Sequence, residues 1–260
     1  MSDYLERSKQ MLGDDKISSL GDKTILVIGI GGVGGTALEA LARSGFKKFI
    51  IIDSDKVDVS NLNRQILFTS DDIGVDKVDA AKRHLLKINK DFDVTAIKEK
   101  IVEGSLDKLS LSKVDFIVDA IDFVEGKLDI YDFAINNNIP FISSLGMGNR
   151  LDPEQVCVTK LNKTENDPLA KKIRYLAKQK GLDLKEINVV FSNETPLLKS
   201  PKPTSMIMVP STAGLVIAKY VLSTVLQWYN YINEVKEYDE SNHRNCKDSK
   251  DRWEVCRYVW

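Results

Sequence analysis

The chain has 260 residues, of which 43% are hydrophobic and 29% charged, and its 37 Lys and Arg nearly balance its 38 Asp and Glu. This length fits one large α/β domain, or a domain with an extension, of ordinary soluble character. The net charge of −1 predicts no polyanion partner from the overall field of the protein. Three cysteines without regular spacing argue against a disulfide framework and suit a reducing compartment.

The first residues predict an N-terminal arm. Residues 1–22 have the apolar spacing of a short amphipathic helix followed by a connector. The stretch from Met1 to Arg7 lacks the apolar core of a signal peptide, so we expect a cytoplasmic protein.

The stretch from Ile25 to Lys77 carries the main functional signal. An apolar run, Thr24–Ile28, predicts a buried strand; a helical pattern follows at Thr36–Ser44, and a second apolar run, Phe49–Ile52, ends in Asp53. Between the first strand and the helix, Gly29, Gly31, Gly32 and Gly34 form a Gly-x-Gly-Gly-x-Gly turn. This order is typical of a nucleotide-binding βαβ unit, in which the glycines let the backbone approach a phosphate and a carboxylate binds ribose hydroxyls.

Two basic residues favour ATP over NAD at this turn. Arg64 and Lys77 follow within the same unit, and a triphosphate carries roughly four charges that a bidentate Arg and a point-charge Lys can meet. For either residue alone, a solvated surface charge is the better interpretation. An NAD site, or a module without enzymatic activity, is the alternative.

A magnesium ligand is predicted after the next strand. Val114–Asp119 reads as a buried strand and is followed by Asp122, at the edge of the sheet where ligands bind in open α/β proteins. Asp122 is therefore our candidate for the Mg²⁺ that accompanies ATP. A cap on the following helix is the alternative role.

The remaining elements complete an α/β fold. Further strands are predicted at residues 92–97, 139–144, 152–158 and 206–209, and further helices at 77–87, 167–180 and 213–229. We expect a doubly wound, mostly parallel Rossmann-like sheet with an antiparallel extension in the second half. The last helix is apolar on nearly every side, which favours a buried or dimer-interface helix; its apolar stretch is too short for a membrane span.

The motifs of the first half resemble the ubiquitin-activating-like adenylyltransferases, typified by ThiF and MoeB. They are the glycine turn, Asp53-x-Asp55, Ser60-Asn61-x-Asn63-Arg64-Gln65, Gly74-x-x-Lys77 and Asp119-Ala120-Ile121-Asp122. The resemblance implies an ATP site that also includes Asp55, Asn61 and Asn63. It further implies a homodimer in which the N-terminal Arg7 reaches the partner's ATP site; a solvated helix charge is the alternative for Arg7.

Motifs of the second half resemble the tRNA threonylcarbamoyladenosine dehydratase branch (TcdA, CsdL). They are the Gly146-x-Gly148-x-x-x-Asp152-Pro153 segment, the Asp167-Pro168-Leu169-Ala170 start of a basic helix with its Arg174, and Val190-Phe191-Ser192-x-Glu194. The chain departs from the branch at Thr204-Ser205, where a Gly-Ser is usual. The resemblance implies a tRNA substrate whose threonyl carboxylate, next to the anticodon, is adenylated and then cyclised with loss of water.

The basic helix and the partners follow from this resemblance. Lys171, Lys172, Arg174, Lys178 and Lys180 could contact the tRNA phosphate backbone, although a solvated helix face is the common meaning of such a run. A sulfur-transfer protein is a further possible partner. No membrane partner is expected.

An adenylyltransferase that activates the C-terminal carboxylate of a ubiquitin-like or sulfur-carrier protein is the alternative function. Such members commonly carry paired Cys-x-x-Cys zinc ligands and often a catalytic cysteine, but the cysteines here, Cys157, Cys246 and Cys256, form no such pair. The predicted organisation is an N-terminal arm (1–22), an ATP-binding half (23–150), a substrate-binding and dimerisation half (151–232) and a charged tail (233–260).

Overall fold

The computed structural model describes residues 3–109, 111, 113–198 and 204–227. The predicted tail at 233–260, the end of the helix predicted over 213–229, and both Cys246 and Cys256 lie outside the described residues. The chain divides into two units, Met1–Leu222 and Ser223–Trp260, and the fold given below is that of the first.

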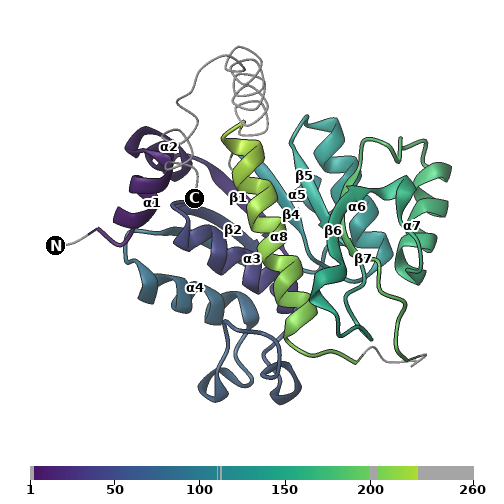
Figure 1. Ribbon diagram of the computed structural model, residues 1–260, viewed down its shortest axis with the longest axis horizontal. Helices are drawn as coiled ribbons and strands as arrows, with labels where there is room; N and C mark the ends of the chain where they lie inside the picture. The colour runs from purple at the N-terminus through teal and green to yellow at the C-terminus, as the bar shows by residue number, and fades with distance from the viewer. Residues whose placement is uncertain (1–2, 110, 112, 199–203, 228–260) are drawn as a thin grey trace, which may run out of the picture. The chain divides into compact units, whose positions relative to one another are not determined.

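The centre of the fold is a seven-stranded sheet with the strand order β3-β2-β1-β4-β5-β7-β6 (Figure 1). Every neighbouring pair is parallel except β6 and β7, which are antiparallel. The predicted Rossmann-like sheet with an antiparallel extension in the second half is therefore confirmed. The strands are β1 (Thr24–Ile28), β2 (Lys48–Ile52), β3 (Asp93–Ile97), β4 (Phe116–Asp119), β5 (Phe141–Ser144), β6 (Val156–Lys160) and β7 (Asn188–Ser192).

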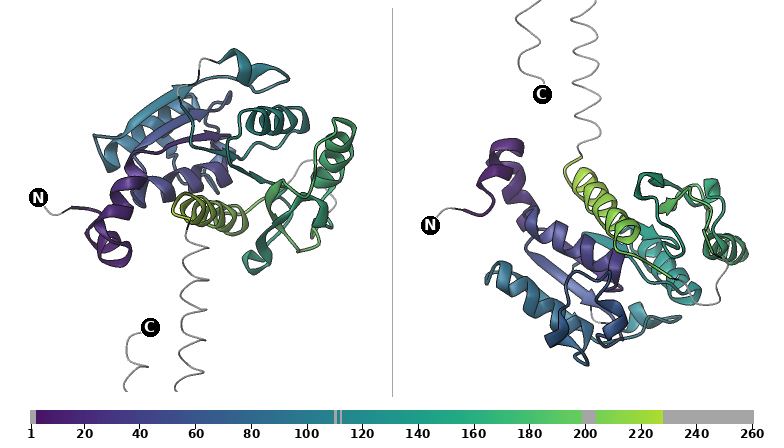
Figure 2. Two further views of the ribbon diagram at one scale, coloured as in Figure 1. Left: turned by 90° about the horizontal axis from the view of Figure 1, so that it is seen from above. Right: turned by 60° about the horizontal axis from the view of Figure 1, so that its bottom comes forward.

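Helices cover both faces of this sheet, as Figures 1 and 2 show. The helices α3, α4 and α8 pack on one face, and α5 and α6 pack on the other, as right-handed crossovers require on the two sides of β1. The α-helices are α1 (Glu6–Leu12), α2 (Asp14–Gly21), α3 (Gly32–Arg43), α4 (Lys77–Ile88), α5 (Ser105–Lys108), α6 (Val124–Asn136), α7 (Pro168–Gln179) and α8 (Met208–Val225).

Two local predictions were wrong. The arm over residues 1–22 holds two helices, α1 and α2, and Gly13 separates them with a φ of +89° that favours glycine. The strand predicted over residues 206–209 does not exist, because α8 begins at Met208. A short apolar run has no distinguishing period, and Pro210 suits a first helical turn, where its missing N–H leaves no bond unmade.

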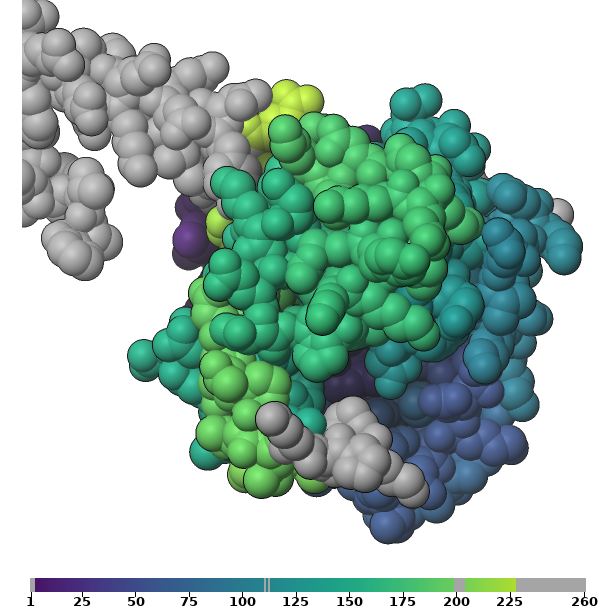
Figure 3. All heavy atoms as spheres, turned by 90° about the vertical axis from the view of Figure 1, so that its right-hand side faces the viewer, coloured from purple at the N-terminus to yellow at the C-terminus, as the bar shows by residue number. Residues whose placement is uncertain are grey.

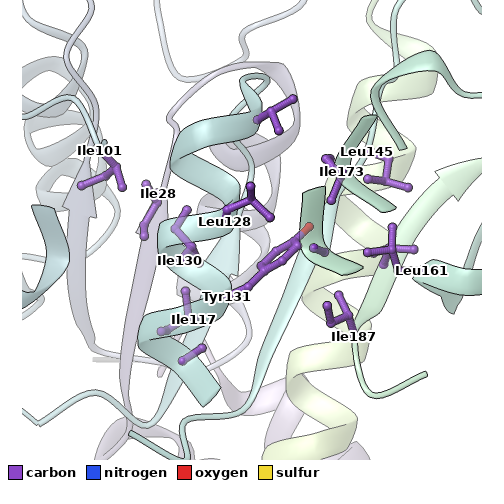
Figure 4. Close-up of a cluster of buried hydrophobic side chains, with 14 of the residues drawn as sticks. Ile28, Ile101, Ile117, Leu128, Ile130, Tyr131, Leu145, Leu161, Ile173 and Ile187 are labelled. Atoms are coloured by element: carbon purple, nitrogen blue, oxygen red, sulfur yellow. The ribbon is translucent and has the colours of Figure 1, made fainter. Parts of the chain in front are cut away.

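A hydrophobic core cluster fills the space between the sheet and helices α6 and α7 (Figure 4). Tyr131 of α6 lies at its centre and is fully buried. The strands β1 and β4 are buried along almost their whole length, as expected for parallel strands covered on both faces.

A buried polar network joins the carboxyl ends of β4 and β5. The ammonium of Lys127 lies 2.8 Å from Asp119 Oδ2 and donates to Ser143 Oγ and to the carbonyl of Ser144. The hydroxyl of Tyr131 lies 2.8 Å from Ser143 Oγ. The side chains of Lys127 and Asp119 are both completely inaccessible to solvent, so the charge of each is compensated by the opposite charge of the other. The network fixes the strand ends from which two loops of the site described below begin.

Helix α8 is a core helix of this unit. Its buried residues Val209, Ala213, Ile217 and Val221 recur every fourth position and form one stripe. A Cβ added to Gly214 would lie 2.6 Å from the carbonyl oxygen of Val33, so the backbones of α8 and α3 are in close contact. The helix begins earlier than predicted, and over Met208–Val225 it is long and apolar enough to cross a membrane by length and composition alone, so the expectation that its apolar stretch is too short was wrong. Of this span, 44% is buried inside the protein.

An ion pair joins α3 to α4. Glu39 lies between His84 Nε2, at 3.0 Å, and Arg43 Nε, at 2.8 Å. The hydrogen bond from His84, and then that from Arg43, hold the pKa of the Glu39 carboxyl below its ordinary value.

This shift predicts how stability depends on pH. Because the Glu39 pKa is lower in the folded state, its contribution to stability is complete above the unfolded value of about 4.3 and is lost as the pH falls further. We therefore expect the melting temperature of Glu39→Gln to be below that of wild type at neutral pH, with a difference that shrinks as the pH falls below about 4.3. Thermal unfolding at several pH values measures this difference. Glu186→Gln, at an exposed carboxylate, is the control, and a difference independent of pH would contradict the assignment.

Candidate active site

A cavity of about 1690 Å³ opens at the carboxyl ends of β1, β2, β4 and β5. Its walls come from the glycine turn, the loops after these strands, the start of α7 and residues 195–198, 205 and 210. In Figure 3 a dark hollow lies between the green residues of the second half and the blue residues of the first, with purple residues at its floor. This is the edge at which open α/β sheets bind ligands.

The glycines of the turn have two different roles: some line the cavity, and one allows close packing of the backbone. Gly29, Gly31 and Gly32 line the cavity, and Gly31 is the N-cap of α3, so the free N–H groups of the first helical turn begin there. Among the described residues, a Cβ added to Gly31 would meet only Gln65 Nε2, at 3.9 Å, so a ligand atom can approach the backbone at this glycine. Gly34 is not among the lining residues, and a Cβ there would lie 1.9 Å from the carbonyl oxygen of Gly29. It allows the turn to close.

Asp53 directly follows β2 and lines the cavity. Its Oδ2 accepts the N–H of Ile30 at 2.6 Å, and its Oδ1 accepts the N–H of Asp55 at 2.8 Å. Burial raises the pKa of this carboxyl above its ordinary value, against the opposing effect of Lys77. Each oxygen retains a lone pair, so the carboxylate can accept hydrogen bonds from the two hydroxyls of a ribose.

Lys77 starts α4 and is held by Asp55. Its ammonium lies 2.9 Å from Asp55 Oδ2, and its backbone N–H donates to the carbonyl of Asp55. The side chain of Lys77 is 8% exposed and that of Asp55 is 65% exposed. Asp55 therefore holds a nearly buried ammonium at the cavity wall, where an incoming phosphate can share it.

Arg64 is oriented by its neighbours. Its Nη1 donates to the carbonyl of Ser60 at 2.7 Å and to Asn63 Oδ1 at 2.9 Å. The amide of Asn63 in turn donates to the carbonyl of Ser205 at 2.9 Å. Asn61 lines the cavity, but its Oδ1 accepts the N–H of Asp58 in a capping box. Asn63 thus positions Arg64 and is itself outside the cavity wall.

Asp122 lies in the cavity wall and is exposed. The N-cap of α6 is Phe123, and no side chain in the described part of the chain caps that helix, so the alternative role of Asp122 as a cap is wrong. Within the described part of the chain, no three His, Cys, Asp or Glu side chains form a group that could hold a metal. A magnesium ion here would be bound through Asp122 and the phosphates of a nucleotide, which suits the preference of Mg²⁺ for one or two carboxylates beside substrate phosphates.

Sequence reasoning missed Gln65 and Arg150. Gln65 is 4% exposed and lines the cavity, and its Oε1 is buried with no hydrogen-bond partner among the residues described. The guanidinium of Arg150 donates to the carbonyls of Gly146, Asn166 and Glu194, and burial lowers its pKa. Gln65 belongs to one of the motifs quoted above, but it carries no charge that would suggest a ligand. The sequence around Arg150 contains no pattern that predicts contacts with three loops.

The structure divides the basic helix. Asp167 caps α7 through Ala170 N and accepts the N–H of Gly146, which attaches the helix to the loop after β5. Lys171 and Arg174 line the cavity, whereas Lys180 pairs with Asp132 at 2.6 Å. The five basic residues of this helix therefore do not all lie at the cavity, and their contact with tRNA stays a prediction.

Arg7 lies on the exposed side of α1 and is not among the residues that line the cavity of its own chain. Its role toward a second copy of the chain remains a prediction.

Comparisons with known proteins agree with this geometry. The model of the ThiF family matches residues 5–256. The tRNA threonylcarbamoyladenosine dehydratase of Bacillus subtilis (strain 168) is 32% identical over 246 residues, which are 87% of this chain and 96% of that protein. The crystal structure of the Escherichia coli tRNA N6-threonylcarbamoyladenosine dehydratase in complex with ATP aligns with a TM-score of 0.81 at 31% identity, over 88% of this chain and 96% of that one.

A second kind of relative covers less of the chain. The sulfur carrier protein ThiS adenylyltransferase of E. coli (strain K12) is 33% identical over 155 residues, which are 57% of this chain and 61% of that protein. The resemblance found in the sequence, to the dehydratase branch of the adenylyltransferases, is confirmed. The chain belongs to the ThiF family.

Proposed function

We propose that the protein is an ATP-dependent tRNA threonylcarbamoyladenosine dehydratase. The observation that carries this proposal is the continuous cavity, in which the glycine turn, Arg64 and Lys77 share one space with a second wall from α7. Such a cavity can hold a nucleotide and a second substrate together. The dehydratases of B. subtilis and E. coli, which this chain matches over nearly their full lengths, support the choice of reaction.

The reaction has two steps. A carboxylate oxygen of the threonyl group attacks the α-phosphorus of ATP, and pyrophosphate leaves. An atom of the carbamoyl group then attacks the activated carbonyl carbon, the ring closes, and AMP leaves, so that the nucleoside has lost one water. Since the attacking atom belongs to the substrate, the reaction needs no enzyme nucleophile, and no cysteine is among the residues that line the cavity in the described chain.

The side chains of the site supply binding and electrostatic stabilisation. We assign Asp53 to the ribose and the turn at Gly31 and Gly32 to the phosphates. Arg64 and Lys77 would neutralise the charge that develops on the phosphates, and Asp122 would hold Mg²⁺, which adds positive charge beside the leaving pyrophosphate. In this proposal the enzyme acts in the cytoplasm.

A homodimer is part of the proposal. Arg7 is exposed on α1, and Leu215 of α8, on the side away from the buried stripe, is 55% exposed. A second copy would cover this apolar side chain and bring its own Arg7 to the ATP site. A sulfur-transfer protein remains a further partner that the sequence suggested.

The test is nucleoside mass spectrometry after incubation of tRNA with the purified protein and MgATP. We expect threonylcarbamoyladenosine to lose the mass of one water only when ATP is present. If the nucleoside stays unchanged while tRNA and ATP are intact, the proposal fails, and activation of a carrier protein, as in the ThiS adenylyltransferases, becomes the better hypothesis.

A further inference from the structure

We propose that Lys171 and the free edge of Arg174 form an anion subsite that binds one backbone phosphate of the RNA beside the nucleotide in the cavity. The inference rests on the proposed function, because it takes the substrate to be a tRNA. In this proposal Lys171 and Arg174 contribute to sequence-independent RNA binding, whereas the other basic residues, Lys172, Lys178 and Lys180, do not.

The position of each basic residue on α7 separates those at the cavity from the rest. Lys171 and Arg174 are three positions apart, which places them on one side of α7, and both line the cavity. Lys172 is exposed on another side of the helix, and Lys178, four positions after Arg174, is exposed on the same side one turn further along. Neither Lys172 nor Lys178 lines the cavity. Lys180 pairs with Asp132 and Glu103, so its charge is already compensated.

Arg174 is oriented before any ligand binds. Its Nη1 donates to the carbonyl of Thr164 at 2.8 Å and to the hydroxyl of the same residue. Its Nε and Nη2 have no partner among the residues that the structure describes. A guanidinium fixed on one edge loses little conformational freedom when the other edge binds an anion, and its fork suits a phosphate.

Lys171 completes the subsite from the preceding helical turn. Its ammonium has neither an ion-pair partner nor a hydrogen-bond partner within the described ranges, and the side chain is exposed at the cavity wall. A lysine is a mobile point charge, so it can follow a phosphate whose exact height above the helix varies.

A backbone phosphate fits this position better than the other anions of the reaction. In the proposed function the triphosphate has its own partners in Arg64, Lys77 and the start of α3, on a part of the cavity wall that other elements than α7 form. The reacting carboxylate must lie at the α-phosphate and so belongs to that wall too. A nucleotide whose base enters the cavity from an RNA chain keeps a singly charged phosphate on each side of its ribose, so backbone phosphates accompany the substrate to this site.

The test compares Lys171→Ala with Lys172→Ala in binding to an anticodon stem-loop RNA. Two forms of the RNA are used, with and without the threonylcarbamoyl group on the target adenosine, so that only one form carries the carboxylate. We expect Lys171→Ala to weaken both RNAs equally, by about tenfold, as for one lost charge-assisted hydrogen bond. The slope of log K against log salt should fall by about 0.7, as for one phosphate of a single strand.

The controls separate the possible failures. Lys172→Ala should bind RNA like wild type, both variants should bind MgATP like wild type, and Arg174→Lys, which keeps one donor for Thr164, should weaken both RNAs. Equal effects of Lys171→Ala and Lys172→Ala would overturn the subsite. A loss confined to the modified RNA would overturn it in favour of carboxylate binding. If wild type binds RNA but removes no water from the nucleoside, the proposed function fails, and the comparison of the two variants still decides the subsite.

Discussion

Arg64→Ala is expected to slow adenylate formation by about 10³-fold, as for the loss of one donor aimed at developing charge. The side chain lies in the cavity wall, and Asn63 and the Ser60 carbonyl hold one of its nitrogens. The guanidinium therefore loses little conformational entropy when it binds the transition state. The hydrogen bonds that it makes are solvent-exposed, so the free energy of unfolding should change by no more than about 1 kcal/mol. Pyrophosphate release with the modified tRNA measures the rate, and thermal unfolding measures the stability.

Arg43→Ala is the matched control for this prediction. Arg43 is 57% exposed on the last turn of α3, outside the cavity, and its ion pair with Glu39 is a surface contact. It should leave the rate unchanged. An Arg64→Ala enzyme with the wild-type rate would show that the phosphates lie elsewhere in the cavity.

The elements that could be predicted from the sequence are those with strong local signals. Strands β1, β2 and β4 are apolar along almost their whole length because both faces of the parallel sheet are covered, so a run such as Thr24–Ile28 is recognisable without knowledge of its neighbours. Helix α4, with its helical period, was predicted to within one residue. The run Met206–Val209 has no such period, and there the prediction failed.

Much of the site could not be predicted, because it depends on contacts between distant residues. Asn63 and Ser205, whose contact helps to orient Arg64, are 142 positions apart. Arg150 joins loops that the sequence separates by up to 44 positions. Arg64 and Lys77 themselves could be predicted as phosphate-binding residues, because their charges lie within the nucleotide-binding unit. The side of α7 that faces the cavity is set by the cap at Asp167 and its bond to Gly146, which no local pattern shows.

The second large effect is expected from substitutions in the glycine turn. Alanine at Gly31 should weaken ATP binding, whereas alanine at Gly34 should lower the stability of the protein. In Gly31→Ala the new methyl group meets no atom of the described residues closer than 3.9 Å, and the backbone there has a φ of −91°, which alanine adopts easily. We expect its stability to stay within about 1 kcal/mol of wild type, the scale of an N-cap change. The methyl group would stand where a phosphate must approach, so the Kd for ATP should rise roughly 30-fold, which corresponds to about 2 kcal/mol of steric cost.

Gly34→Ala should show the opposite order of effects. Its methyl group would lie 1.9 Å from the carbonyl oxygen of Gly29, and the backbone must move to admit it. Overpacking of this kind costs about 2 to 3 kcal/mol, which lowers the melting temperature by roughly 5 to 10 °C, and ATP binding is lost with the shape of the turn. Calorimetry with ATP and thermal unfolding of both variants separate the two roles. If Gly31→Ala bound ATP like wild type, the phosphates would not approach the turn at that residue. If Gly34→Ala were as stable as wild type, the turn could move to admit the methyl group, and close packing of its backbone would not order the N-terminus of α3.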